Sequence, residues 1–414
     1  MSLLTDYSVP AERSHRHEAG SGDNTRGRSS SFPPVREWIE SFTPHKILEV
    51  VNLASGNPDV IPLWFGESDL PTPEFICAAV TEAMAKGNTF YAPRRGLPAL
   101  RQELADYVSG LYGRHVSVDR VTVTTGAINA IMLAMQMLVR PGDNVVIVSP
   151  SWPNSGETVN VMGGQLRPVH LEMMNGRLDL NLDKLFSAVD QRTRIVFINS
   201  PSNPTGWVMS KAQQQTVLEF CRAREVWLLS DEVYGRLVYE GRAAPSLLEI
   251  AEPDDPVLIV NSFSKTWAMT GWRVGWLITP AQFGPVLESL IDYNVSGVPT
   301  FIQPAAMAAL RHGETFARTM VEYCQQGREA VVKGFSEIPR IRLQPPQGAF
   351  YAFFRIEGIT DSFEYAKHLV RNVGVGIAPG AAFGASGEGW FRLCFARSKP
   401  IIEQAVLRLG DELC

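Results

Sequence analysis

The sequence lacks the patterns that mark several common classes of protein. No apolar run reaches the roughly 18 residues needed to cross a membrane, and the N-terminus has no apolar segment of the kind found in signal peptides. The five cysteines are scattered, odd in number and without a C-x-x-C pair. These features argue against a disulfide framework and favour a reduced, cytoplasmic protein.

The charge and the absence of certain motifs argue against further classes of protein. The net charge is only −5 and no long basic run occurs, so we expect neither nucleic acid nor membrane partners. The seven histidines show no metal-ligand spacing, and His15 and His17 lie in a polar tail, so no metal site is predicted. The glycine fingerprint of dinucleotide-binding folds and the P-loop of nucleotide triphosphatases are both missing.

The composition that remains is typical of a globular protein. The chain has 414 residues, of which 45% are hydrophobic and 20% charged, and this length allows roughly two to three domains. Residues 1–31 are rich in Ser, Arg, Glu and Gly and are predicted to form a disordered tail. We expect residues 32–70 to pack with a small domain at 311–414, and residues 71–310 to form a large domain that binds a cofactor.

From about residue 120 onward, short apolar runs alternate with amphipathic stretches. The runs are rich in Val and Ile without clean alternation, which favours strands buried on both faces of a parallel sheet. The candidate strands are 121–125, 144–149, 166–171, 194–200, 226–230, 257–262 and 274–279, and helical patterns include 126–139, 211–224 and 282–293. The predicted fold class is α/β, with a mostly parallel sheet covered by helices on both faces, plus a smaller α+β domain.

Polar side chains follow several of these runs. In open α/β sheets ligands bind beyond the carboxyl ends of the strands. "GAINA" follows the first run, "PSNPTG" the fourth, "DEVY" the fifth and "FSK" the sixth. A lysine, an aspartate, an asparagine, a tyrosine, serines and the start of a helix are therefore expected at one edge of the sheet.

Each of these features also has an ordinary explanation. "NPTG" is a good turn sequence, Asp231 can cap a helix, and an isolated Lys265 would usually be a solvated surface residue. Together they match the needs of pyridoxal 5′-phosphate. Its aldehyde bonds to a lysine amine, its ring nitrogen needs a carboxylate, and its phosphate favours arginine, hydroxyls and helix N-terminal amides.

At this point the sequence resembles a known family. "SFSKTWAMTGWRVG", "NSPSNPTG" and "LSDEVY" are similar to motifs of the fold-type I pyridoxal-phosphate enzymes, and within them of the class I/II aminotransferases. "GESDLPTP", "TFYAPRRGLPALR", "SPSWPN" and "QGAFYAF" extend the resemblance from about residue 33 to the C-terminus. The segments "GESDLPTPEF" and "RGLPALR" look most like those of bacterial aspartate aminotransferases.

The resemblance implies a role for each matching residue. The catalytic residues would be Lys265, which bonds to the cofactor and moves the substrate proton, Asp231 on the ring nitrogen and Tyr234 on the ring hydroxyl. The resemblance also implies that Asn203 contacts the ring hydroxyl and the substrate, and that Trp152 contacts the ring face and the substrate. The implied phosphate contacts are Ser262, Ser264, Arg273 and the amides of Ala127 and Ile128. Tyr91 would contact the phosphate of the other subunit. Arg392 would bind the substrate α-carboxylate and the Gly66 loop would close over the substrate. A homodimer with shared sites is implied.

Arg392 can also be considered without the family. It lies in "GWFRLCFA", an otherwise apolar run, and a buried guanidinium without an anion is costly. A protein carboxylate and a ligand are near-equal alternatives from the residues alone, and the resemblance favours the ligand. Desolvation and the nearby Arg273 are expected to lower the pKa of Lys265.

The predicted reaction is transamination between an L-amino acid and a 2-oxo acid such as 2-oxoglutarate. The donor is expected to be aspartate, or one of a broad or aromatic range. Family members that act on dicarboxylates need a cation for the distal carboxylate; some carry a lysine where this chain has Ile128, and Arg94 and Arg95 are candidate replacements. The alternatives are a C–S β-lyase, a decarboxylase or an aminocyclopropane-carboxylate synthase on the same fold, a cofactor-sensing transcription regulator, and an inactive binding protein.

Overall fold

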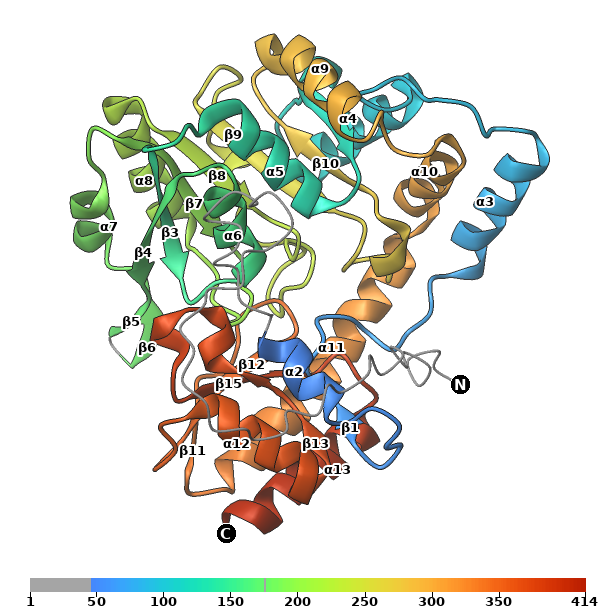
Figure 1. Cartoon of the computed structure of the whole chain (residues 1–414). Helices are drawn as coiled ribbons and strands as arrows, with labels where there is room; N and C mark the ends of the chain where they lie inside the picture. Colours follow the sequence, from blue (N-terminus) through green and yellow to red (C-terminus); the bar gives the residue numbers. More distant parts are fainter. Residues whose placement is uncertain (1–45, 175) are drawn as a thin grey trace, which may run out of the picture.

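The computed structural model describes residues 46–174 and 176–414. The predicted tail at 1–31 and the first part of the segment at 32–70 lie outside these residues. Figure 1 shows an upper part built around one large sheet and a lower part built around a smaller one. In the described part of the chain, no helix combines the length and the apolar character that crossing a membrane requires.

The large sheet contains all the candidate strands. In the described chain it has seven strands in the order β2-β10-β9-β8-β7-β3-β4. Their bounds are β2 Val121–Thr124, β3 Asn144–Ser149, β4 Gln165–His170, β7 Thr193–Asn199, β8 Trp227–Asp231, β9 Val257–Ser262 and β10 Gly275–Ile278. All pairings are parallel except those of β10, which runs antiparallel to both β2 and β9. The predicted α/β class with a mostly parallel sheet is therefore confirmed.

Burial on both faces explains the missing alternation in the strands. In β3, Val145 and Ile147 belong to a core on one face of the sheet, while Val146 and Val148 belong to a core on the other. Since successive side chains point to opposite faces, every position of a covered strand must be apolar. The edge strand β4 differs and is largely exposed.

Helices cover both faces of this sheet. One core includes side chains of α5 (Ala127–Leu138), α6 (Pro153–Val161) and α9 (Gly284–Asn294). The other core includes side chains of α3 (Glu74–Ala85), α4 (Pro98–Tyr112), α7 (Leu182–Ala188), α8 (Lys211–Arg224) and α10 (Gln303–His312). A short hairpin, β5 (Glu172–Met174) and β6 (Arg177–Asp179), extends beyond β4.

The C-terminal part forms the smaller α+β unit that the sequence predicts. Its antiparallel sheet has the order β11-β12-β15-β14, with β11 Ile341–Leu343, β12 Tyr351–Ile356, β14 Ala378–Pro379 and β15 Trp390–Cys394. The surrounding helices are α11 (Glu314–Ser336), α12 (Ser362–His368) and α13 (Lys399–Leu413). Figure 1 shows the long α11 leading from the upper part into the lower one.

The first described residues contact this C-terminal unit. Strand β1 (Ile61–Pro62) pairs in parallel with β13 (Val375–Gly376). Ile47 and Val50 of α2 (Lys46–Asn52) belong to the same hydrophobic core as β12 and β15. Figure 1 accordingly places the blue α2 and β1 among orange and red elements. The division into domains at residues 70 and 310 stays a prediction.

Candidate active site

The polar residues that follow the strands do meet at one edge of the large sheet. Because β2, β7, β8 and β9 are parallel to one another, their carboxyl ends lie on the same side. The antiparallel β10 contributes its beginning at that edge, which is where Arg273 lies. The loop from β9 to β10 thus brings Lys265 and Arg273 to the same edge.

Lys265 is half-buried and contacts the loop that contains Gly66. Its Nζ donates a hydrogen bond to the Gly66 carbonyl oxygen over 2.7 Å. Burial lowers the pKa of Lys265 to about 8, opposed by the Glu67 carboxylate and assisted by Arg392 and Arg273. The expected lowering is confirmed, and near neutral pH an appreciable fraction of this amine is unprotonated and able to act as a nucleophile or base.

Asp231 ends β8 as a buried carboxylate. Its Oδ1 accepts a hydrogen bond from the Val233 amide over 3.2 Å. Burial raises the pKa of Asp231 to about 7, partly offset by that hydrogen bond and by the charge of Lys265. A cationic N–H placed against this carboxylate would restore its ordinary, ionised state.

Asn199 links Asp231 to Asn203, although the sequence did not single it out. Its Nδ2 donates to the Asp231 carbonyl oxygen over 3.0 Å, and its Oδ1 accepts from the Asn203 amide over 2.8 Å. One side chain therefore joins the ends of β7 and β8. Its position four residues before "NPTG" was the only signal in the sequence, and its partners become visible only in the folded chain.

Tyr234 is almost fully buried and faces a second tyrosine. Its hydroxyl lies 2.7 Å from the hydroxyl of Tyr351, and the Nζ of Lys265 lies 5.9 Å from the centre of its ring. Tyr351 belongs to the quoted segment "QGAFYAF", but no role was assigned to it from the sequence.

The start of α5, Arg273 and two serines form a cluster suited to an anion. A Cβ at Gly126 would lie 2.7 Å from Arg273 Nη2, so the guanidinium packs directly on the glycine that precedes α5. Ser262 Oγ donates to Ser264 Oγ over 2.8 Å. No side chain of the described residues caps α5, so the amides of its first turn are available. A helix N-terminus beside an arginine and hydroxyls is a phosphate-binding arrangement.

The backbone at Arg273 is held in a rare conformation. Its φ of 53° is in the left-handed region, which is unfavourable for a residue with a side chain. The guanidinium also donates from Nη1 to the Thr270 carbonyl oxygen over 2.8 Å. Such local strain is characteristic of binding sites, where the surrounding structure imposes it.

Arg392 is a buried cation whose partners are neutral. Its Nη1 donates to Asn203 Oδ1 over 2.9 Å, and its Nη2 donates to the Trp64 carbonyl oxygen. Its Cζ lies 4.6 Å from the ring centre of Tyr351 and 4.8 Å from that of Phe383. Its buried Nε has no partner among the described residues, and none of their carboxylates pairs with it. Of the two alternatives left open above, this geometry supports an anionic ligand.

The other predicted residues are less closely tied to this cluster. Trp152 is half-buried and directly precedes α6. Tyr91 is 84% exposed, and within this chain its ring contacts the guanidinium of Arg94, whose Cζ lies 5.5 Å from the ring centre.

Arg94 and Arg95 are both engaged within their own chain. Arg94 forms an ion pair with Asp292. Arg95 donates from Nε to Thr122 Oγ1 over 3.0 Å and from Nη2 to the Asp119 carbonyl oxygen over 2.6 Å. These contacts make Arg95 a structural residue at the start of β2 and count against its suggested role as a substrate-binding cation.

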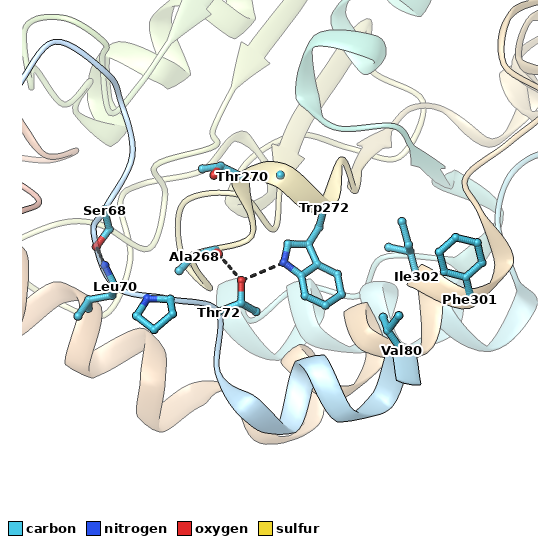
Figure 2. Close-up of a pocket in the computed structure, with 11 residues that line it drawn as sticks. Ser68, Leu70, Thr72, Val80, Ala268, Thr270, Trp272, Phe301 and Ile302 are labelled. Atoms are coloured by element: carbon cyan, nitrogen blue, oxygen red, sulfur yellow. Dashed lines mark hydrogen bonds between the residues drawn. The ribbon is translucent and has the colours of Figure 1, made fainter. Parts of the chain in front are cut away.

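A cavity of about 470 Å³ adjoins the site without containing Lys265, Asp231 or Arg392. Figure 2 shows the hydrogen bonds on its wall, where Trp272 Nε1 donates to Thr72 Oγ1 and Thr72 Oγ1 donates to the Ala268 carbonyl oxygen. These bonds fix the loop between Lys265 and Arg273 against the segment that follows Gly66. The wall of this cavity therefore helps to hold the loop that carries Lys265 and Arg273.

Residues 49–409 match the family described as aminotransferase class I and II. The chain belongs to this family. It is 34% identical over 383 residues to an aspartate aminotransferase of Pyrococcus horikoshii, covering 92% of this chain and 97% of the relative. It is 32% identical over 390 residues to aromatic-amino-acid aminotransferase 2 of Thermococcus litoralis, covering 92% and 98%. The structure of Thermus thermophilus aspartate aminotransferase with maleate is also similar, with a TM-score of 0.86, 29% identity and coverage of 92% and 100%.

Class I and II aminotransferases use pyridoxal 5′-phosphate, and the residues present here fit this cofactor. The missing Cβ at Gly126 lets the Arg273 guanidinium pack against the start of α5, where the guanidinium and the helix amides together would hold a phosphate. Asp231 would supply a buried carboxylate for a protonated ring nitrogen, and Lys265 would supply the amine. The chain is thus an aminotransferase-family enzyme whose residues fit the cofactor of the family.

Proposed function

We propose that this enzyme transfers the amino group of an L-amino acid to a 2-oxo acid such as 2-oxoglutarate, with aspartate or a broad or aromatic set of donors. The observation that carries the proposal is Arg392, a buried cation with neutral partners that is hydrogen-bonded to Asn203 and close enough to Lys265 to lower its pKa. Relatives named for aspartate and for aromatic amino acids support both donor classes. The internal contacts of Arg94 and Arg95 give aspartate no preference over aromatic donors.

Each residue would act through its own contacts. The cofactor, when bound, withdraws electrons from the substrate α-carbon. Lys265 would hold the cofactor and then carry the proton from that carbon, for which a pKa of about 8 is well suited near neutral pH. Asp231 would keep the ring nitrogen protonated. Asn203 and Tyr234 would donate to the ring oxygen, and Arg392 would orient the α-carboxylate by two parallel hydrogen bonds.

The remaining contacts complete the proposed site. Ser262, Ser264, Arg273 and the amides of Ala127 and Ile128 would bind the phosphate, and Trp152 would stack on the ring and contact the substrate. The loop that contains Gly66 would close over the substrate. Its position at the site is supported by the hydrogen bond that the Gly66 carbonyl oxygen accepts from Lys265.

We also propose a homodimer in which Tyr91 reaches the phosphate of the other subunit. Its 84% exposure, together with 83% for the adjacent Phe90, is unusual for aromatic side chains and suits a surface covered by a second copy. The five free cysteines support a reducing, cytoplasmic location. Sedimentation of the purified protein, with Tyr91→Ser as the variant, tests the dimer: loss of cofactor affinity in a still dimeric variant supports the shared site.

A donor panel followed by absorbance tests the function. Purified protein with pyridoxal phosphate should show a visible band that aspartate, or an aromatic amino acid, bleaches and that 2-oxoglutarate restores. Release of pyruvate and ammonia from a cysteine conjugate, without any 2-oxo acid, would instead assign a C–S β-lyase. Release of carbon dioxide would assign a decarboxylase.

A further inference from the structure

Tyr351 contacts three parts of the candidate site, namely Tyr234, Arg392 and the loop that contains Gly66. It is fully buried at the start of β12. Its hydroxyl is 2.7 Å from that of Tyr234, and its ring lies 4.6 Å from the Cζ of Arg392. A Cβ at Gly66 would lie 2.0 Å from the Tyr351 hydroxyl oxygen.

The backbone holds Tyr351 rigidly in this position. In the antiparallel pair β12–β15, Tyr351 lies opposite Cys394 and Phe353 lies opposite Arg392. Side chains two positions apart share a sheet face, so Tyr351 and Arg392 are diagonal neighbours on one face. The preceding Ala349 is fixed by a hydrogen bond from its amide to the Leu237 carbonyl oxygen over 2.8 Å.

The hydrogen bond between the two tyrosine hydroxyls must have a definite direction. Burial raises the pKa of both phenols, so each keeps its proton, and each has only one O–H to donate. If Tyr234 donates to the ring oxygen of the cofactor, it cannot also donate to Tyr351. The hydrogen bond between them must then run from Tyr351 to Tyr234.

We propose that Tyr351 is a positioning residue whose hydroxyl directs the Tyr234 hydroxyl toward the cofactor and whose ring holds the Arg392 guanidinium for the substrate carboxylate. This proposal rests on the proposed transamination. Donation from Tyr351 polarises the Tyr234 hydroxyl and strengthens its own donation to the ring oxygen. The Tyr351 ring presents its negative face to the guanidinium and restricts it without neutralising it.

Tyr351→Phe tests the hydroxyl by itself, because the ring remains. With the weaker donor, the ring oxygen of the cofactor is less stabilised as an anion. We expect the pH midpoint of the visible band of the Lys265-bound cofactor to rise by about 0.5 to 1 unit. The KM for the amino donor should stay within about twofold, since the Arg392 contact is retained.

Tyr239→Phe is the matched control for this change. Tyr239→Phe likewise removes one hydroxyl, which in this case donates to the Ala349 carbonyl oxygen, and the Tyr239 ring likewise lies beneath a guanidinium, that of Arg328. Its described contacts include none to Tyr234, Arg392 or Gly66. Its pH midpoint should equal that of the unsubstituted enzyme.

Tyr351→Leu tests the ring. We expect the KM for the donor to rise by about 3- to 30-fold relative to Tyr351→Phe, because Arg392 loses one of its two aromatic walls. The inhibition constant of a non-reacting α-methyl amino acid should rise by the same factor, which identifies a binding effect rather than a chemical one.

A double variant tests the contact with Gly66. Gly66→Ala should weaken donor binding strongly, since its Cβ collides with the Tyr351 hydroxyl, and the next ring atom would be 3.1 Å away. Adding Tyr351→Phe removes the colliding oxygen and should recover at least about tenfold of the lost kcat/KM. Absence of any recovery would contradict the contact.

The results separate this proposal from the function on which it rests. An unchanged pH midpoint in Tyr351→Phe, or an equal shift in Tyr239→Phe, overturns the hydroxyl role. Equal KM values for the Phe and Leu variants overturn the ring role. An unsubstituted enzyme that binds cofactor with a visible band but transfers no amino group refutes the proposed transamination, while the midpoint shift still reports on Tyr351.

Discussion

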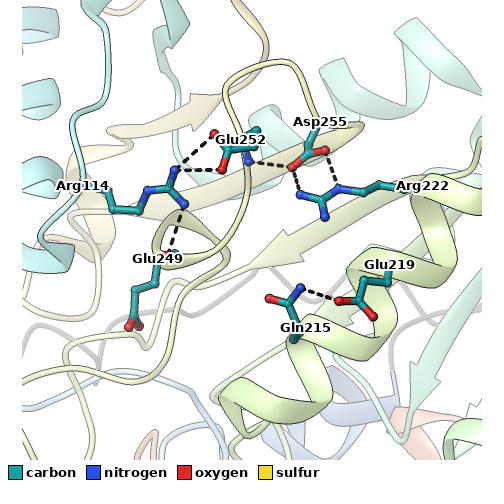
Figure 3. A network of polar contacts seen from close by, with 7 residues as sticks. All are labelled: Arg114, Gln215, Glu219, Arg222, Glu249, Glu252 and Asp255. Carbon is teal, nitrogen blue, oxygen red and sulfur yellow. Dashed lines mark hydrogen bonds and ion pairs between the residues drawn. The ribbon is translucent and has the colours of Figure 1, made fainter.

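Two groups of charged side chains in this enzyme are arranged in opposite ways. In the surface network of Figure 3, Arg222 donates from Nε to Asp255 Oδ1 over 2.6 Å and from Nη2 to Oδ2, and Arg114 donates to both oxygens of Glu252. In the active site, the buried Arg392 has only neutral partners, and Asp231 accepts one backbone amide.

The pKa values of two aspartates express the same difference. Burial acts to raise the pKa of Asp255, but the hydrogen bonds from Arg222 and from the Glu252 amide, together with the charge of Arg222, outweigh it and the pKa is lowered. Burial raises that of Asp231 to about 7, and its weaker partners do not compensate. The surface charges pair with one another, whereas the charges of the site have no oppositely charged side chain of the described residues bonded to them. Perturbed, uncompensated charges of the second kind are typical of functional sites, in agreement with the proposed binding role.

The largest expected effect comes from removing the site lysine. Lys265→Ala should lower kcat by at least about 10⁴-fold, because both the covalent attachment and the proton carrier are lost. Single-turnover measurement of amino-group transfer checks this. Lys211→Ala, which breaks a surface pair with Glu249, is the control and should retain full activity.

Replacing the unpaired site cation should cost less but remain selective. Arg392→Lys keeps the charge and loses the planar pair of donors, so we expect kcat/KM for the amino donor to fall by about 10- to 200-fold. Cofactor affinity, measured by absorbance titration, should change little. A fall in cofactor affinity equal to the fall in kcat/KM would contradict the assignment of Arg392 to the substrate.

The buried carboxylate of Asp231 should destabilise the cofactor-free protein. The folded pKa of Asp231, about 7, lies above the ordinary value of 3.8 for an aspartate, so the fold favours the protonated carboxyl. That contribution is complete below about pH 4 and is lost as the pH rises through about 7. Relative to the parent, Asp231→Asn should therefore gain on the order of 2–4 kcal/mol in unfolding free energy between pH 4 and pH 8. Urea unfolding of both cofactor-free proteins at several pH values measures this difference.

The smallest effect is expected at the surface pair. Arg222→Ala should lower the unfolding free energy by about 0.5 to 1.5 kcal/mol, because the partly exposed pair is screened by solvent. Salt should reduce the difference, and kcat should not change. A loss of activity comparable with that of Arg392→Lys would show that the two groups are not distinct.

The strands of the large sheet could be predicted because they are covered on both faces. Complete burial demands continuous runs of Val and Ile, and such runs are visible without an alignment, as in 144–149 and 257–262. The run at 166–171 was predicted from the same pattern, although the edge strand β4 at this place is largely exposed. The order of strands was not predictable, since β10 is inserted between β2 and β9 by contacts between distant segments.

The residues of the candidate site also divide into those that the sequence can locate and those that it cannot. Asp231 ends a strand, and Lys265 and Asn203 lie within four residues of the ends of theirs, so the parallel sheet brings them together and the sequence can locate them. Asn199, Trp64 and Tyr351 act through partners up to hundreds of residues away, and no local pattern indicates those contacts. The internal contacts of Arg95 could not be predicted for the same reason, because Asp119 and Thr122 engage it only after folding.

The sequence by itself determined the fold class and the family, and it indicated the chemical groups that we propose for the cofactor site. These depend on burial patterns and on short motifs, both of which are local. Only the tertiary structure decided that Arg392 has neutral partners and that Tyr351 joins Tyr234, Arg392 and Gly66. Those facts depend on which surfaces of two sheets face each other, and that is settled by packing of the whole chain.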